Sequence, residues 1–152
     1  FAGVADYDRD GRQDIVARDN GTGRLWLYPG QSTRGYSSLG RFEIGNGWNA
    51  MTFAGVADYD RDGRQDIVAR DNGTGRLWLY PGQSTRGYSS LGRFEIGNGW
   101  NAMTFADVAD YDRDGSQDIV ARDNGTGRLW LYPGQGTRGY SSLGRFEIGN
   151  GW

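Results

Sequence analysis

Residues 6–14 read Asp-Tyr-Asp-Arg-Asp-Gly-Arg-Gln-Asp, and the same stretch recurs at 58–66 and, with one change, at 110–118. Each copy places carboxylates at positions 1, 3, 5 and 9 and a glycine at position 6. Ionised carboxylates held this close raise one another's pKa, and a bound cation removes that cost. Calcium accepts roughly six to eight oxygen ligands from a flexible loop, and Gly11 can adopt the positive φ of a sharp turn. The pattern therefore predicts three calcium loops.

This stretch differs from other calcium loops, and one copy of it can also be explained without a metal. An EF-hand loop needs a bidentate glutamate at position 12, where this chain has Ala17, Ala69 or Ala121. Aspartate and glycine are also ordinary turn residues, so a single copy is compatible with a metal-free turn. The glycine, the fourth aspartate and the threefold repetition favour calcium.

Composition and charge limit both the partners and the chemistry. The 152 residues include 17 arginines and 19 acidic residues, for a net charge of −2, with no lysine, histidine or cysteine. The usual zinc ligands, histidine-based catalysis and disulfides are therefore excluded. No basic stripe indicates a nucleic-acid partner, and no long apolar run indicates a membrane span or a signal peptide. Because a calcium site of millimolar affinity is filled outside cells, we expect a secreted, extracellular parent protein.

The whole chain is an internal repeat with a period of 52 residues. We assign one repeat each to residues 1–52, 53–104 and 105–152, and the first two are identical over 1–48 and 53–100. The third copy differs at Asp107, Ser116 and Gly136, and it lacks the Asn-Ala-Met-Thr linker found at 49–52 and 101–104. Such near-identity indicates recent duplication or deliberate design, and the end of the chain at a repeat boundary favours an engineered or excised segment.

Each copy carries four strand signals and no helical period. In the first copy the expected strands cover residues 1–5, 15–17, 25–28 and 41–44. The turn sequence of residues 20–23, Asn-Gly-Thr-Gly, predicts a hairpin between the second and third strands. The third strand is apolar on both faces and is expected to be buried on both sides, whereas the fourth alternates as an edge strand does.

A repeated four-stranded antiparallel unit of this length, with small residues first and an alternating strand last, is typical of a β-propeller blade. Small residues suit the crowded axis of a propeller, and the alternating strand suits its rim. One blade exposes two apolar faces and needs neighbours to cover them. We therefore predict an all-β propeller with three four-stranded antiparallel blades per chain.

Residues 1–16, Phe-Ala-Gly-Val-Ala-Asp-Tyr-Asp-Arg-Asp-Gly-Arg-Gln-Asp-Ile-Val, resemble the FG-GAP (VCBS-type) repeat of integrin α-subunit propellers and secreted microbial proteins. Residues 23–30, Gly-Arg-Leu-Trp-Leu-Tyr-Pro-Gly, and 44–48, Ile-Gly-Asn-Gly-Trp, are similar to actinobacterial members. The resemblance implies about one Ca²⁺ per repeat, held between the first and second strands of each blade. The implied ligands are four aspartate side chains and one backbone carbonyl per loop: Asp6, Asp8, Asp10, Arg12 and Asp14; Asp58, Asp60, Asp62, Arg64 and Asp66; Asp110, Asp112, Asp114, Ser116 and Asp118.

Propellers of the family that this chain resembles close with about seven blades, and three blades cannot close a ring. An open monomer would leave apolar blade faces in water. We therefore expect the chain to bind copies of itself, with a homodimer of six blades favoured and a nine-bladed trimer as the second choice.

The sequence is compatible with three functions: a non-catalytic calcium-stabilised scaffold, a multivalent carbohydrate-binding lectin, and an enzyme. The scaffold is the expected function. For the lectin, sugars would stack on the tryptophans of the Gly-Asn-Gly-Trp turns, with tyrosines of the long polar loop as second choices. These residues are Asn46, Trp48, Asn98, Trp100, Asn150 and Trp152, then Tyr36, Tyr88 and Tyr140.

Each alternative has a plainer explanation. The turn tryptophans are better explained as filling the seam between blades. Trp26, Trp78 and Trp130 lie inside a strand and are expected in the core. A glycosidase needs a pair of carboxylates, but the loop aspartates are assigned to the metal. The remaining acids are typical surface groups: Asp19, Asp71, Asp123, Glu43, Glu95 and Glu147. We therefore expect no enzymatic activity.

Overall fold

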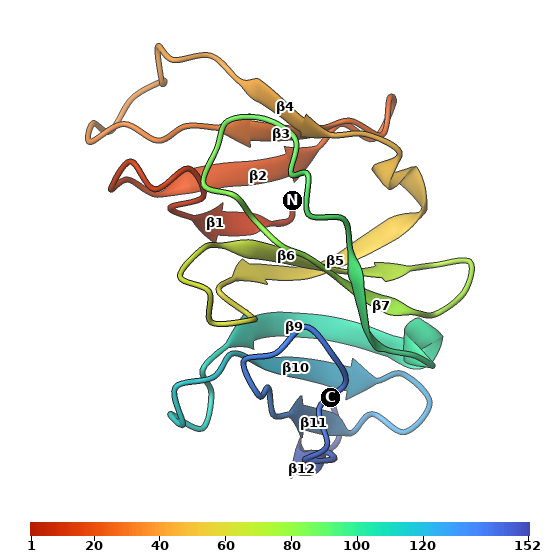
Figure 1. Cartoon of the computed structure of the whole chain (residues 1–152). Helices are drawn as coiled ribbons and strands as arrows, with labels where there is room; N and C mark the ends of the chain where they lie inside the picture. The colour runs from red at the N-terminus through yellow and green to blue at the C-terminus, as the bar shows by residue number, and fades with distance from the viewer.

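The structure, a computed structural model that describes residues 1–152, consists of three four-stranded antiparallel sheets without an α-helix (Figure 1). The first sheet contains β1 (Gly3–Ala5), β2 (Asp14–Arg18), β3 (Leu25–Tyr28) and β4 (Phe42–Gly45). The second contains β5 (Met51–Ala57), β6 (Asp66–Asp71), β7 (Leu77–Tyr80) and β8 (Phe94–Gly97). The third contains β9 (Met103–Ala109), β10 (Asp118–Asp123), β11 (Leu129–Tyr132) and β12 (Phe146–Gly149). In each sheet the strands lie in chain order, as in three propeller blades that do not close a ring.

The strands confirm the predicted blade, with one difference at its start. The segment 49–52, which was expected to be a linker, is instead part of the structure: the 3-10 turn η1 (Trp48–Ala50) is followed directly by β5, whose first residue Met51 pairs with Asp71. The extra pairs form because β6 continues to Asp71, so that the incoming chain has free backbone groups to bond. The turn η2 (Trp100–Ala102) repeats this geometry before β9.

The third strand of each blade is buried less evenly than predicted. Leu25 and Leu27 are fully buried, as expected for a strand covered on both sides. Trp26, between them, is only half-buried, and the guanidinium of Arg41 lies over its ring with Cζ 4.0 Å from the ring centroid. The same contact repeats at Trp78 and Trp130. These tryptophans were expected inside the core. They lie instead at the edge of the core, each in a cation–π contact with an arginine.

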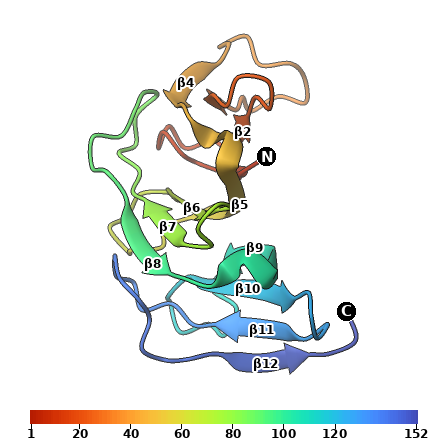
Figure 2. The same ribbon diagram turned by 90° about the vertical axis from the view of Figure 1, so that its right-hand side faces the viewer.

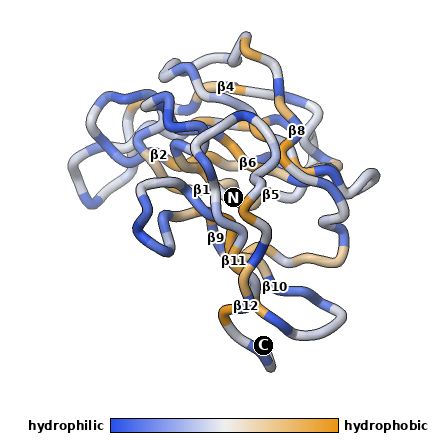
Figure 3. The backbone as a smooth tube through the Cα atoms, turned by 60° about the horizontal axis from the view of Figure 1, so that its bottom comes forward, coloured by the Kyte–Doolittle hydropathy of each residue, from blue (hydrophilic) through white to orange (hydrophobic).

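The three blades are arranged as an open fan. Their first strands, β1, β5 and β9, lie side by side near its centre (Figure 3). Their small residues allow this approach. A Cβ atom added to Gly3 would lie 3.0 Å from the Cβ of Val56 on the next blade, and Gly55 stands in the same relation to Val108. Glycine at this position therefore sets the spacing between neighbouring blades.

The hydrophobic core lies in the seams between the blades, which stack one on another in Figure 2. One cluster joins residues of the first blade, including Tyr7 and Trp48, to Ile67 of the second. The ring of Trp48 stacks on Phe53 at 5.4 Å and meets Tyr80 at 4.5 Å. Because each blade covers its neighbour, a single blade has no complete core of its own.

Candidate metal centres

Each aspartate stretch folds into a tight loop between the first two strands of its blade. In the first loop, Asp6 Oδ2 accepts a hydrogen bond from the amide of Gly11 at 3.0 Å, and Asp8 Oδ1 accepts one from Asp10 at 3.0 Å. Gly11 has a φ of 87°, the left-handed conformation that was predicted for position 6. Arg9 also has a positive φ, 61°, which the sequence did not indicate. These local bonds bend the chain so that alternate side chains turn inward.

The loops bring three carboxylates together in every blade. The grouped residues are Asp6, Asp8 and Asp10; Asp58, Asp60 and Asp62; and Asp110, Asp112 and Asp118, with carboxylate oxygens within 4.8 Å of one another. Oxygen ligands of this number and kind suit a hard divalent cation. In the first two loops the fourth predicted ligand, Asp14 or Asp66, lies outside the group, and in the third Asp114 does. The part predicted for the carbonyls of Arg12, Arg64 and Ser116 remains a prediction.

The aspartate at position 9 of each loop connects two backbone segments by accepting hydrogen bonds from their amides. Asp14 is completely buried. Its Oδ2 accepts hydrogen bonds from the amides of Tyr7 at 3.0 Å and Asp8 at 3.3 Å, and its Oδ1 accepts one from Gly30 at 2.9 Å. Asp66 and Asp118 make the same three contacts in their blades. One carboxylate thus joins the aspartate loop to the end of the third strand.

One oxygen in each loop has no hydrogen-bond partner. The Oδ1 atoms of Asp6, Asp58 and Asp110 are buried and accept no hydrogen bond from the protein. A buried carboxylate oxygen without a donor is costly, and a cation bound in the loop would compensate it. The donor set and these unpartnered oxygens therefore fit a divalent metal ion in all three loops.

Burial disfavours the charged form of the loop carboxylates. Desolvation raises the pKa of Asp66 to about 7, even though three backbone amides bond to its ionised form. Desolvation also raises the pKa of Asp14 and of Asp58, and the neighbouring charges of Asp62 and Asp60 add to the effect at Asp58. A metal ion would act in the opposite direction, because its ligands must be deprotonated.

We therefore expect the metal-free chain to be more stable at pH 5 than at pH 7.5. The pKa of Asp66 is raised from 3.8 to about 7 on folding, so between these values the folded state holds a proton that the unfolded state has lost. Stability then falls as pH rises through this window. Urea unfolding of metal-stripped protein at the two pH values tests this expectation. Equal stability, or greater stability at pH 7.5, would contradict it. With calcium present the trend should reverse, because protons compete with the ion.

An arginine of the next blade binds each of the first two aspartate loops, which are called the inner loops below. The sequence did not indicate this contact. Arg86, in the long loop between β7 and β8, donates from Nε to Asp8 Oδ2 and from Nη2 to Asp10 Oδ2 at 3.1 Å. Figure 1 shows this loop reaching up across the first blade. Arg138 binds Asp60 and Asp62 in the same way from the third blade. The guanidinium thus bonds two of the three grouped carboxylates of the loop and leaves the buried Oδ1 of the first aspartate without a partner.

A family model described as FG-GAP-like repeat matches residues 6–69 and 58–121. Each match begins at the first aspartate of one loop and includes the whole loop of the next blade. The chain belongs to the FG-GAP-like repeat family. FG-GAP repeats are generally non-catalytic, often bind calcium and are typically extracellular. No curated protein and no solved structure matched the chain. None of its helical turns is long and apolar enough to cross a membrane.

Two of the three tryptophans considered as a sugar platform lie within the seams of this FG-GAP unit. Trp48 and Trp100 are each only 7% exposed, and their rings face aromatic side chains of the next blade. Asn46 also bonds across the seam, from Nδ2 to the hydroxyl of Tyr88 at 3.1 Å. The seam explanation therefore accounts for the first two turns. Only Trp152, at the open end, is exposed, at 67%.

Proposed function

We propose that this chain is a non-catalytic, calcium-binding β-propeller module, a metal-stabilised scaffold whose copies join into a closed ring. The observation that carries the calcium assignment is the unpartnered, buried Oδ1 of the first aspartate in all three loops, beside two further carboxylates. Calcium is the divalent ion that best suits such a loop, because it tolerates irregular oxygen coordination. The ion would tie the two ends of the loop and so link metal binding to folding.

The scaffold function is supported by the contacts that the repeated aspartates and tryptophans make. The loop aspartates bond to backbone amides and to an arginine of the next blade, and the turn tryptophans fill seams. The aspartate ties recur in all three blades, and the arginine and tryptophan contacts recur in both internal seams, so the chain offers repeated structural contacts rather than one distinctive centre. An extracellular setting would supply the millimolar calcium that weak sites need.

Ring closure is supported by the apolar faces at the two ends of the fan. Phe1 and Val4 are exposed on the first blade, and Tyr111 and Phe146 on the third. Monomeric proteins rarely leave such faces in water. Two chains would supply six blades and three chains nine, and we favour the dimer because it needs the fewest partners.

Calcium should raise the melting temperature of the chain strongly. A ligand present at about a hundred times its dissociation constant adds roughly 2.7 kcal/mol per site. With three sites, in a domain where about 1 kcal/mol shifts the midpoint by roughly 2–4 °C, the increase should exceed about 10 °C. Differential scanning calorimetry in millimolar calcium, compared with excess chelator, measures it. Magnesium at the same concentration should stabilise less, because it requires stricter octahedral geometry.

The Asp58→Asn variant provides a matched control for this experiment. It removes the charge of the unpartnered oxygen in the middle loop while retaining an acceptor for the amide of Gly63, and Asp58 does not take part in the contact with Arg138. Isothermal titration should then find one calcium ion fewer per chain than in the parent protein. An unchanged melting temperature in calcium, or no heat of binding, would overturn the calcium assignment.

A further inference from the structure

The chain has two internal seams, one between the first and second blades and one between the second and third. Equivalent polar contacts occur in both. In the first seam, Arg86 of the second blade binds Asp8 and Asp10 of the first, and the hydroxyl of Tyr88 donates to Glu43. The second seam repeats these contacts with Arg138 and Tyr140 of the third blade. Each seam therefore joins a long loop of one blade to the aspartate loop and the outer strand of the blade before it.

At the two ends of the chain the same groups lack these partners. Arg34 and Tyr36 of the first blade correspond to Arg86 and Tyr88, and both are exposed, Tyr36 completely. At the other end, the third aspartate loop has no arginine on Asp112 or Asp114, whereas each inner loop binds one arginine from the next blade and one of its own, Arg12 or Arg64. One end thus presents a free cation where the other presents free carboxylates.

The apolar residues of the seam show the same division. Ile15 of the first blade is 41% exposed, while its counterpart in the second blade, Ile67, is 3% exposed beneath the neighbouring sheet. On the opposite face, Tyr111 of the third blade is 55% exposed, whereas Tyr7 in the first blade is 5% exposed. The exposed face of the first blade therefore has the composition of a seam half, and the third blade presents the other half.

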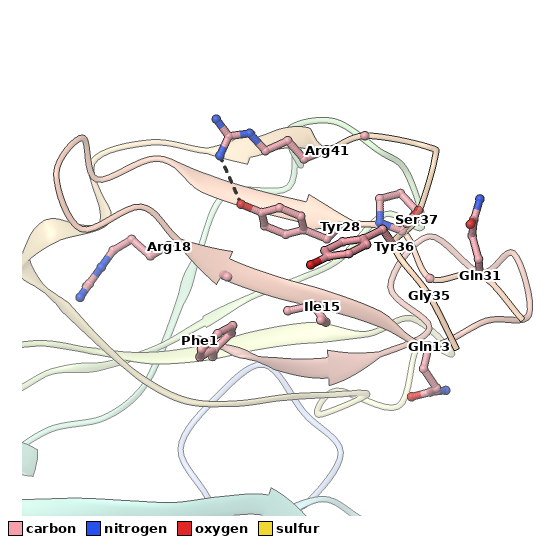
Figure 4. A pocket seen from close by; sticks show the side chains of 14 residues that line it. Phe1, Gln13, Ile15, Arg18, Tyr28, Gln31, Gly35, Tyr36, Ser37 and Arg41 are labelled. Carbon is pink, nitrogen blue, oxygen red and sulfur yellow. Dashed lines mark hydrogen bonds between the residues drawn. The ribbon is translucent and has the colours of Figure 1, made fainter. Parts of the chain in front are cut away.

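The hollow on the first blade shows what would fit there. It measures about 860 Å³ and is lined by Phe1, Ile15, Tyr28 and Tyr36, with Arg41 bonded to the hydroxyl of Tyr28 at its rim (Figure 4). At the first internal seam, Ile67, Tyr80 and Tyr88 line the equivalent space. The preceding blade contributes Ile44 and Trp48 there. The counterpart of Trp48 at the other end of the chain is Trp152, whose side chain is exposed.

We propose that a second copy of this chain completes the third aspartate loop, with its Arg34 bound to Asp112 and Asp114 and its Tyr36 bound to Glu147. This inference rests on the proposed ring and specifies its seam. Trp152 of the first copy then fills the hollow beside Tyr28 and Ile15 of the second. The contact is head-to-tail, so that each copy offers one surface and uses the other, and such an interface closes into a ring when the rotation permits.

One residue prevents the new seam from being an identical copy of the internal ones. Asp107 stands where Gly3 and Gly55 approach the valine of the next blade, and a Cβ atom there is 3.0 Å from the valine Cβ in the internal seams. Asp107 would face Val4 of the second copy. The innermost strands must therefore separate slightly at this seam, and Asp107→Gly should tighten association between chains at least severalfold.

Complementation between two variants tests the arrangement. Arg34→Glu places a negative charge opposite Asp112 and Asp114, and Trp152→Ala empties the hollow, so each variant disables a different end of the chain. In calcium, light scattering should show the parent protein at two or three times the 16.8 kDa of one chain. Each variant alone should have the mass of one chain, and an equimolar mixture should have twice that mass, because one intact pair of ends remains. Arg34→Lys, which retains the charge but not the bidentate fork, should associate more weakly than the parent.

The outcomes separate this inference from the ring on which it rests. A parent protein that stays at the mass of one chain in calcium would overturn both. A parent that assembles while Arg34→Glu assembles equally well would overturn only the role of Arg34. A mixture that stays at the mass of one chain would overturn the head-to-tail arrangement.

Arg34 forms no hydrogen bond or ion pair within its own chain, so circular dichroism should show its variants folded. The Arg34→Ala variant repeats the test without a charge reversal.

Discussion

Replacing Asp66 with alanine should lower the free energy of unfolding of the metal-free chain by about 3–5 kcal/mol. The substitution removes a fully buried carboxylate that accepts hydrogen bonds from the amides of Tyr59, Asp60 and Gly82. Two buried donors and one part-buried donor lose their acceptor at once, and the aspartate loop loses its connection to the end of β7. Urea unfolding followed by circular dichroism, with calcium removed, isolates this structural contribution from any role in metal binding.

Asp71→Ala is the matched control for this variant. Asp71 lies in the same blade and also accepts hydrogen bonds from two backbone amides, those of Gly73 and Thr74, but at an exposed turn. Water can replace the lost acceptor there, so the expected cost is about 1 kcal/mol or less. If both variants lost the same stability, burial would not be the source of the effect at Asp66.

Replacing Trp100 with alanine should cost about 3–5 kcal/mol, the usual range for deleting a large buried aromatic side chain. Its ring stacks on Phe105 at 5.5 Å and meets Tyr132 at 4.5 Å, so the cavity would open in the seam between the second and third blades. Neighbouring blades touch across this seam, and the substitution should therefore weaken their association as well as the local packing. Urea unfolding followed by circular dichroism measures the loss.

Trp152→Ala provides the comparison, because it deletes the same side chain at the equivalent position of the third blade. Both substitutions are best measured on the Arg34→Glu background, where the open ends are expected to stay unpaired. Trp152 is 67% exposed, so its removal there should cost about 1 kcal/mol or less. A large cost for Trp152, or a small one for Trp100, would contradict the assignment of these tryptophans to the seam.

Much of the blade follows from spacing within a few residues. The alternation of aspartates, the glycine at position 6 and the apolar run at residues 25–28 act through local backbone geometry, which neighbouring residues control directly. The period of 52 residues then requires three equivalent units. For these reasons the sequence by itself determined the three blades, their strand order and the presence of an acidic cluster in each loop, but not which three of the four aspartates group together.

The tertiary structure decided how these units use their side chains. Arg86 and Asp8 are 78 residues apart, and nothing in the spacing of one repeat shows that the long loop of a blade lies over the aspartate loop of the previous one. The same holds for Trp48, which is suited to a sugar platform or to a seam until the next blade covers it. Asp14 was predicted only as a metal ligand, but its contact with Gly30 makes it a backbone tie. These roles depend on how one sheet packs on the next, and relative placement is a property of the folded whole rather than of any local pattern.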